Sequence, residues 1–422
     1  PGWAATAPRE RDEVLRRAYE AMTARAEEFA HLIALEMGKA LTDARGEVGY
    51  AAEFFRWFSE EAVRIDGALR TAPSGAHRIL TFRRPVGVAL LVTPWNFPAA
   101  MATRKIAPAL AAGCSVVLKP AEDTPLTALL LAQVLSDCGA PPGTVNVVTT
   151  DRPGELVGAA LADPRVRKLS FTGSTGVGRT LLRQSAERVV NTSMELGGNA
   201  PFIVLDDADL DAAVDGAMVA KTRGGGQACT AANRFLVQES VAADFAARLA
   251  ERMGALRVGP GTDERTQLGP MVNARAVDGI ADKVDRSVAA GAKVVVGGSR
   301  PDGPGSFYPA TVLTDVPPDS PVATEEVFGP VAPIIAVRDE SEALALANSV
   351  DVGLAAYVYT GDLARGLRVC EGLEVGMVGL NRGLVSDPAA PFGGVKQSGL
   401  GREGGYEGID AYLETTYVAA DW

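Results

Sequence analysis

Hydrophobic and polar positions recur along this chain with two different periods. Residues 8–36 and 40–67 are rich in Ala, Glu and Arg, and their apolar residues have the spacing of one helix face. This pattern predicts two long surface helices, separated at Gly38 and ended near Gly67.

A different pattern follows in residues 69–84, which are mostly polar. Near the end of this stretch Leu80 and Phe82 alternate with polar neighbours, which indicates a β-hairpin that projects from the body of the protein. Residues 412–418 show the same alternation, and we expect this strand to join the hairpin. A projecting sheet of this kind can pair with another subunit, so we expect a homodimer or a homotetramer.

Between these parts, strand-like and helix-like segments alternate in two series. This rhythm is typical of βαβ units and predicts an α/β fold, with two doubly wound parallel domains plus a small β oligomerisation element. The first series has strands at 88–92, 115–118, 145–148 and 168–171, with helices at 99–112, 124–138 and 154–162. The second has strands at 201–205, 234–237, 293–296, 331–336 and 355–358. The expected boundaries are 1–66 with 86–196 for the first domain, 197–400 for the second, and 67–85 with 405–422 for the oligomerisation element.

Length and charge narrow the functional class. At 422 residues the chain is longer than one ordinary domain, and its hydrophobic fraction of 47% supports large cores. The 41 Lys and Arg against 52 Asp and Glu give a net charge of -11, which argues against nucleic acid or an anionic membrane as a partner. The apolar runs are too short to span a membrane, and residues 1–6 carry no targeting signal. We therefore expect a soluble cytoplasmic enzyme of small metabolites.

Cysteine and histidine usage limits the chemistry further. The four cysteines are scattered, which suits a reducing compartment better than a disulfide framework. Because His31 and His77 are the only histidines, we expect neither a histidine-based triad nor a metal site. The general base of any reaction is then a carboxylate or a lysine.

Residues 194–229 join two reactive side chains through a buried strand. Glu195 precedes the apolar run 201–205, a helical pattern covers 210–222, and three consecutive glycines lead to Cys229. Glycines permit backbone conformations that other residues rarely adopt, so this loop can present the thiol in a strained geometry. The stretch is interpreted as a carboxylate base and a thiol nucleophile.

Polar side chains also follow the strands of the first series. Asn96 stands directly after strand 88–92, at the edge where open α/β sheets bind ligands, and its amide can donate to an oxyanion. Taken alone, the motif is equally compatible with a proline-bounded turn. Lys119 and Glu122 follow the next strand and can hold ribose or phosphate, although a solvated turn explains them too.

Two glycine-rich segments differ in their expected roles. Residues 171–178 form a strand-to-helix turn whose backbone amides can meet a pyrophosphate, although the spacing is not that of the usual dinucleotide fingerprint. Residues 399–404 match that fingerprint, but they follow no predicted strand and open no βαβ unit. We therefore interpret the second match as a coincidence.

Seven motifs occur in the order in which one enzyme family carries them, and on these motifs the chain resembles the NAD(P)-dependent aldehyde dehydrogenases from about residue 10 onward. The motifs are Pro-Trp-Asn-Phe-Pro at 94–98, Lys-Pro-Ala-Glu at 119–122, Phe-Thr-Gly-Ser at 171–174, Glu-Leu-Gly-Gly at 195–198, Gly-Gln-Ala-Cys at 226–229, Glu-Glu-Val-Phe-Gly-Pro at 325–330 and Pro-Phe-Gly-Gly-Val-Lys-Gln-Ser-Gly at 391–399. Compared with the family, the chain begins inside the expected fold.

The resemblance implies a mechanism. Cys229 attacks the aldehyde, the Asn96 amide and the Cys229 backbone N–H hold the oxyanion, hydride passes to the nicotinamide, and Glu195 activates water to release a free acid. The first domain is then the NAD(P)-binding domain and the second the catalytic domain. The implied cofactor-binding residues are Thr93, Pro94, Trp95, Lys119, Glu122, Gly173, Ser174, Gly178, Leu196, Glu326 and Phe328. A carboxylate at position 122 would repel a 2′-phosphate, so we expect NAD, with NADP as the alternative.

The local sequence is most similar to the succinate-semialdehyde dehydrogenases of this family. That resemblance places Arg104, Arg223 and Ser386 as a clamp for the distal carboxylate, and arginine forks suit a carboxylate well. Either arginine alone is also explained by a structural ion pair. The expected substrate is succinate semialdehyde. The alternatives are another aldehyde such as glutarate semialdehyde, or a non-catalytic relative with a binding or structural role.

Overall fold

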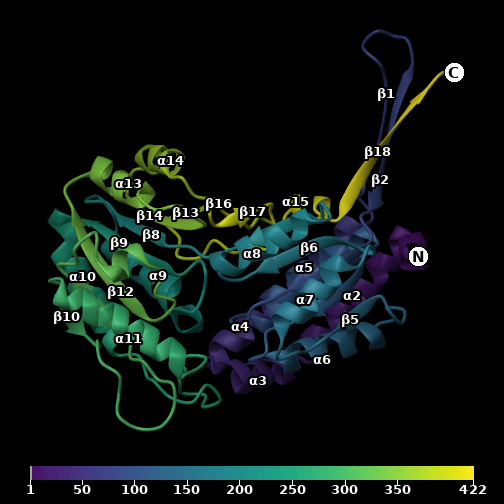
Figure 1. Ribbon diagram of the computed structural model, residues 1–422. Helices are drawn as coiled ribbons and strands as arrows, with labels where there is room; N and C mark the ends of the chain where they lie inside the picture. Colours follow the sequence, from purple (N-terminus) through teal and green to yellow (C-terminus); the bar gives the residue numbers. More distant parts are fainter. Residues whose placement is uncertain (1) are drawn as a thin grey trace.

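Two large β-sheets, a three-stranded sheet and the two-stranded pair β13-β16 organise the computed structural model, which describes residues 2–422 (Figure 1). The first large sheet has the strand order β17-β7-β6-β3-β4-β5, and its strands are parallel except for the short edge strand β17. Its strands are β3 Val88–Val92, β4 Ser115–Lys119, β5 Val145–Val147, β6 Val166–Thr172, β7 Asn191–Glu195 and β17 Gly399–Leu400. Its connecting helices are α5 Pro98–Ala112, α6 Pro125–Asp137, α7 Pro153–Ala162 and α8 Thr175–Ala186. The alternation predicted from the sequence is confirmed here, except that β7 is too polar for the pattern to reveal it.

The second large sheet has the strand order β10-β11-β12-β9-β8-β14-β15. The expectation of an all-parallel sheet is wrong at one edge, where β10 runs antiparallel to β11. An edge strand pairs on one side only and is free to run either way, which is common in α/β proteins. The strands are β8 Ala200–Val204, β9 Ala232–Gln238, β10 Lys293–Val296, β11 Thr311–Thr314, β12 Val331–Val337, β14 Ala355–Tyr359 and β15 Met377–Leu380. The helices are α9 Leu210–Thr222, α10 Glu239–Gly254, α11 Ala274–Ala289, α12 Pro321–Thr324, α13 Glu340–Asn348 and α14 Leu363–Gly372.

The N-terminal helices correct the prediction of two long surface helices. The first predicted helix is divided at Arg25 into α2 Pro8–Ala24 and α3 Ala26–Met37. No glycine or proline causes this break; it lets Met22 and Phe29, on either side, both become fully buried. Gly38 ends α3 in the left-handed conformation, as expected of a helix C-terminal glycine.

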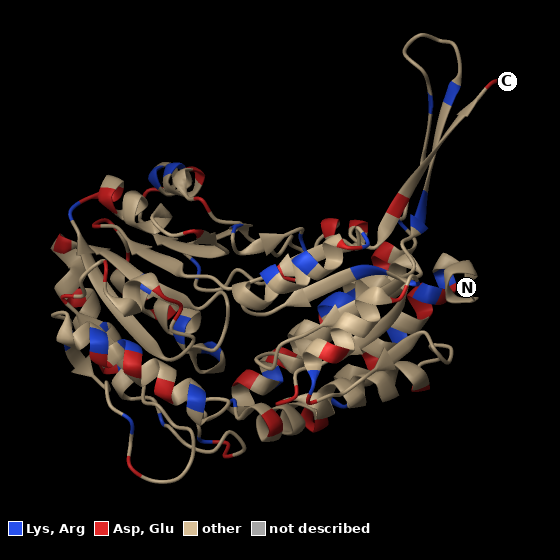
Figure 2. Cartoon of the chain, in the orientation of Figure 1, with Lys and Arg blue, Asp and Glu red and all other residues tan. Residues whose placement is uncertain are grey.

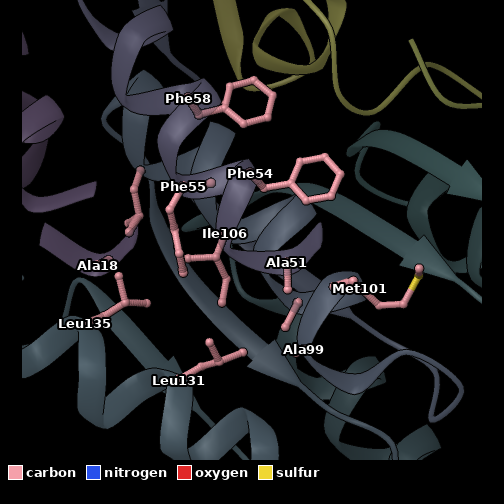
Figure 3. Packing of buried hydrophobic residues seen from close by; sticks show 14 of the residues in the cluster. Ala18, Ala51, Phe54, Phe55, Phe58, Ala99, Met101, Ile106, Leu131 and Leu135 are labelled. Carbon is pink, nitrogen blue, oxygen red and sulfur yellow. The ribbon is translucent and has the colours of Figure 1, made fainter. Parts of the chain in front are cut away.

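Helix α4, Leu41–Ala62, is largely buried rather than a surface helix. It packs against α2 on one side and α5 on the other. Figure 3 shows Phe54, Phe55 and Phe58 of α4 with Ile106 of α5 in this cluster. Each fully buried phenylalanine contributes about 1.5–3 kcal/mol of transfer free energy, so α4 is firmly fixed beside α5. This contact matters because α5 begins at the candidate site.

A three-stranded antiparallel sheet projects from the body of the molecule (Figure 1). It consists of β1 Ala68–Thr71, β2 Arg78–Pro85 and β18 Leu413–Ala420, and β18 pairs with β2 along its whole length. The predicted hairpin and its C-terminal partner strand are thus confirmed. The remaining short elements are α1 Gly2–Ala5, β13 Val352–Gly353, β16 Val395–Lys396 and α15 Glu407–Asp410.

Acidic and basic residues are interspersed along the chain, as the colours of the cartoon in Figure 2 show. No helix within residues 2–422 combines the length and the apolar character needed to cross a membrane.

Candidate active site

A cavity of about 220 Å³ lies where the two large sheets meet. Residues that follow β3 and β6 form one wall, and residues that follow β7 and η1, the 3-10 turn Arg223–Gly226, form the other. The carboxyl ends of parallel strands are where open α/β sheets bind ligands. The lining residues are Pro94, Trp95, Asn96, Met101, Thr172, Gly173, Ser174, Leu196, Gly197, Cys229, Glu326 and Phe328.

Asn96 enters this cavity from the loop between β3 and α5. Its side chain is buried, and its Nδ2 donates a hydrogen bond of 2.9 Å to the backbone oxygen of Gln227, two residues before Cys229. An amide nitrogen carries two protons, so this bond leaves the second available to a ligand. The bond also ties the Asn96 loop to the loop that carries the thiol.

The thiol loop has the left-handed backbone that its three glycines permit. Gly224, Gly225 and Gly226 have φ values of 60°, 68° and 73°, all in the left-handed region. A side chain at Gly226 is further excluded, because its Cβ would lie 2.3 Å from the Gly329 oxygen. The loop ends at Cys229, which is partly exposed and lines the cavity.

Glu195 is the last residue of β7 and does not itself line the cavity, whereas the next residue, Leu196, does. Its side chain is buried, and none of the residues 2–422 gives its Oε2 a hydrogen bond. Burial raises the pKa of Glu195 well above its usual range, and the nearby carboxylate of Glu403 adds to this effect. Burial likewise raises the pKa of the Cys229 thiol to about 12.

An aromatic pair and a carboxylate form the outer part of the cavity. The rings of Trp95 and Phe328 meet edge to face with centroids 5.5 Å apart, and Phe328 adopts a positive φ of 54°. Glu326 accepts a hydrogen bond of 3.2 Å from the Gly198 N–H, and burial raises its pKa to about 7. Strained backbone of this kind persists where the surrounding structure enforces it, often at ligand sites.

The other expected cofactor residues lie outside this cavity. Lys119 at the end of β4 pairs with Glu122 at 2.7 Å, and half of the Glu122 side chain is exposed. Thr93 donates its backbone N–H to the Lys119 oxygen, which links the ends of β3 and β4. Gly178 of α8 supports Leu196 instead, because a Cβ there would lie 2.5 Å from the Leu196 side chain.

The donor set fits a dinucleotide. Ser174 caps the N-terminus of α8 beside the glycine turn, where backbone N–H groups favour phosphate. The Thr172 hydroxyl is buried, with no hydrogen-bond partner in the described part of the chain. The Glu326 carboxylate and the flat rings of Trp95 and Phe328 complement a ribose and a nicotinamide. Residues 2–422 contain no cluster of His, Cys, Asp and Glu side chains that could hold a metal ion.

A second, narrow cavity of about 20 Å³ adjoins Cys229 on the other side. It brings together the three residues expected to bind substrate, Arg104, Arg223 and Ser386. Arg104 is fully buried and pairs with Glu403 at 2.6 Å, whereas its Nη1 has no hydrogen-bond partner within residues 2–422. The Arg223 guanidinium lies over the Phe97 ring, 4.7 Å from its centroid.

Some lining residues were not anticipated from the sequence. Phe97 and Met101 belong to the Asn96 motif and the helix that follows, so their proximity could have been inferred. Tyr50 sits in the middle of α4, and only the structure reveals it as a lining residue, both of the second cavity and of a surface groove that also includes Arg223 and Ser386. The other unanticipated lining residues are Thr172 and Gly197 in the first cavity and Ala228, Thr230 and Phe392 in the second.

The chain is similar to known proteins over nearly its full length. It is 58% identical to the succinate-semialdehyde dehydrogenase of Paenarthrobacter nicotinovorans, over 99% of this chain and 92% of the relative. It is 48% identical to the glutarate-semialdehyde dehydrogenase of Pseudomonas putida, over 99% of this chain and 86% of the relative. Among solved structures, an NADP-dependent enzyme of E. coli matches with a TM-score of 0.98 and 46% identity, over 100% of this chain and 88% of that one.

The family assignment agrees with the fold and with the motifs. Residues 1–418 match the aldehyde dehydrogenase family. The expected α/β fold class is confirmed by the same structural match. The chain therefore belongs to the aldehyde dehydrogenase family and is an NAD(P)-dependent aldehyde dehydrogenase.

Proposed function

We propose that the protein oxidises succinate semialdehyde to succinate. The observation that carries this proposal is the convergence of Arg104, Arg223 and Ser386 on the narrow cavity beside Cys229. Two guanidinium groups and a hydroxyl suit a carboxylate, and Arg104 has a buried donor nitrogen that no described residue uses. The names and identity of the relatives support the same substrate class.

Cys229, Asn96 and Glu195 would carry the chemistry. The Cys229 thiol would lose its proton to water and attack the aldehyde carbon as the thiolate, and the oxyanion that forms would be held by the second Asn96 amide proton and the Cys229 backbone N–H. The chemistry that bound NAD(P) supplies is hydride acceptance. Glu195 then takes a proton from the water that releases the acyl group, which yields a free acid and restores the thiol.

The cofactor would be held at the ends of the first sheet. Gly173 and Ser174 suit the pyrophosphate, Lys119 and Glu122 suit the adenosine ribose, and Glu326 suits the nicotinamide ribose. Thr93, Pro94, Trp95, Gly178, Leu196 and Phe328 would shape the rest of this site. The Glu122 carboxylate favours NAD, although the similar E. coli enzyme is NADP-dependent. The domain boundaries expected from the sequence remain part of this proposal.

The projecting sheet favours a homo-oligomer. Leu69, Phe82 and Tyr417 are 64%, 45% and 54% exposed on its three strands. Such large exposed hydrophobic residues on a protruding sheet suit pairing with a second copy of the chain. We propose a dimer or a tetramer assembled through this sheet.

A matrix of cofactors and aldehydes tests the proposed function. NAD and NADP would each be combined with succinate semialdehyde, glutarate semialdehyde and butanal, and turnover followed by the absorbance of the reduced nicotinamide. We expect the highest kcat/KM with succinate semialdehyde and NAD. Glutarate semialdehyde is the second candidate, because one extra methylene changes binding by only about 1–3 kcal/mol. A preference for butanal would contradict the proposal.

A further inference from the structure

Tyr50 has a buried hydroxyl group with no evident structural purpose. It lies on α4, and its side chain lines the narrow cavity together with the proposed carboxylate clamp. Across residues 2–422 its hydroxyl makes no hydrogen bond of good geometry, although the side chains of Arg104 and Ser386 lie close enough to lower the pKa of the phenol. A buried phenol hydroxyl normally has one, and leaving it unpaired costs about 1–3 kcal/mol.

The Tyr50 hydroxyl lies near two positively charged arginine side chains, in a cavity of small volume. The Arg223 guanidinium lies 5.7 Å from the Tyr50 ring centroid, and Arg104 and Ser386 line the same cavity. The ring itself is fixed, because it packs edge to face on Phe54 at 5.0 Å. A cavity of about 20 Å³ has room for about one water-sized group, so a carboxylate oxygen placed there touches the lining on every side.

We infer that Tyr50 is a specificity-determining residue, whose hydroxyl donates a hydrogen bond to the distal carboxylate of the substrate. This inference rests on the proposed function, and it adds a fourth donor to Arg104, Arg223 and Ser386. A carboxylate offers about four acceptor positions, so it can accept a hydrogen bond from Tyr50 in addition to those from the other three side chains. Burial raises the pKa of the Tyr50 phenol, so the group stays a neutral donor throughout the working pH range.

The same hydroxyl would discriminate against neutral aldehydes. A substrate that ends in a methyl group leaves the Tyr50 hydroxyl and the arginine donors buried without a partner. Sites built to hydrogen-bond a substrate group reject analogues without it far more strongly than an apolar pocket would. Tyr50 thus contributes both to binding the acid and to excluding its neutral analogue.

The variant Tyr50→Phe removes only the oxygen atom, which makes no hydrogen bond of good geometry within residues 2–422. We expect kcat/KM for succinate semialdehyde to fall about tenfold or more through KM, with kcat nearly unchanged, as for loss of a hydrogen bond to a charged group. The kcat/KM for butanal should stay equal to or above the wild-type value. Equal losses for both aldehydes, or no loss for either, would overturn the inference.

A matched control is available between α2 and α4. Tyr19 also has an arginine over its ring, with the Arg56 guanidinium at 5.7 Å, and both residues line a surface groove away from Cys229. Tyr19→Phe should leave both aldehydes at wild-type rates. The substrate preference of the wild-type enzyme tests the proposed function separately from the role of Tyr50. No preference for the carboxylated aldehyde would refute the proposed function, whereas a wild-type preference that Tyr50→Phe retains in full would refute only the role of Tyr50.

Discussion

The ammonium group of Lys39 donates a hydrogen bond of 2.7 Å to the backbone oxygen of Asn96. Its second partner is the Glu47 carboxylate at 2.5 Å, and both side chains are fully buried. Glu47 also accepts the backbone N–H groups of Ala99 and Ala100, in the first turn of α5. A buried ion pair therefore fixes both the loop that carries Asn96 and the helix that carries Arg104.

Replacing either residue of the Lys39–Glu47 ion pair should lower kcat, even though neither side chain contacts the substrate. In Glu47→Gln the amide keeps an acceptor for α5 while the negative charge is lost, and in Lys39→Met the Asn96 oxygen loses its donor. We expect kcat to fall about tenfold or more for carboxylated and neutral aldehydes alike, with a loss of about 3–5 kcal/mol in unfolding free energy. Steady-state kinetics and denaturant unfolding measure the two effects.

Arg45 provides the control for this pair. It lies on the same helix and pairs with Glu27 and Glu264 at the surface. Exposed ion pairs contribute about 0–1 kcal/mol, so Arg45→Met should leave activity and stability nearly unchanged. A folded Glu47→Gln enzyme with full kcat would show that the ion pair does not position Asn96.

Cys229 and Glu195 should give different defects. Cys229→Ala should abolish turnover. Cys370→Ala should retain turnover, because Cys370 packs against the hydrophobic core around the second large sheet and lines neither cavity. Glu195→Gln should form the acyl enzyme once and then stall, because the thioester is no longer hydrolysed. Rapid mixing would detect one equivalent of reduced nicotinamide. Normal steady-state rates in Cys229→Ala would refute its role as nucleophile.

The Cys229 thiol should be unreactive at neutral pH in the cofactor-free enzyme. Its pKa is raised to about 12 by burial, so the thiolate fraction should rise about tenfold for each pH unit between pH 7 and 10. Alkylation by iodoacetamide, followed on the Cys229 peptide by mass spectrometry, should rise in the same proportion without levelling. An ordinary thiol with a pKa near 8.5 levels off above about pH 9.5. Such a plateau at Cys229 would contradict the raised pKa of this thiol.

Glu122 should set the cofactor preference. Replacing it by serine removes the charge that opposes a 2′-phosphate and frees Lys119, its ion-pair partner. We expect the ratio of kcat/KM for NAD over NADP to fall about tenfold in Glu122→Ser. If this ratio does not change, residues other than Glu122 determine the cofactor preference.

The sequence alone predicts the parts of this molecule in which local pattern and chemistry coincide. Parallel strands appear in the sequence as short apolar runs. The three glycines before Cys229 predict a loop whose backbone other residues rarely adopt. Arg104, Arg223 and Ser386 come from distant parts of the sequence, yet the family resemblance suffices to predict that they meet, and they do.

The support of the site is less accessible to sequence analysis. Lys39, Glu47 and Tyr50 belong to a region whose many charged residues predict a surface helix. The structure instead packs this helix against α2 and α5, and it buries Lys39, which precedes the helix, together with Glu47 and the Tyr50 hydroxyl. Their spacing places Glu47 and Tyr50 on one helix face, but only tertiary contacts reveal that this face is buried. The strand β7 is likewise not predicted, because its polar sequence gives no sign that tertiary contacts bury it.

The most direct test of the central claim is the kinetic effect of Arg223→Ala on two aldehydes of equal length. With the carboxylate clamp in place, kcat/KM for succinate semialdehyde should fall about 100-fold, while that for butanal should change by no more than about threefold. Arg223 contacts no reacting atom in this account, so a loss of equal size for both aldehydes would contradict the claim that this cavity recognises the distal carboxylate.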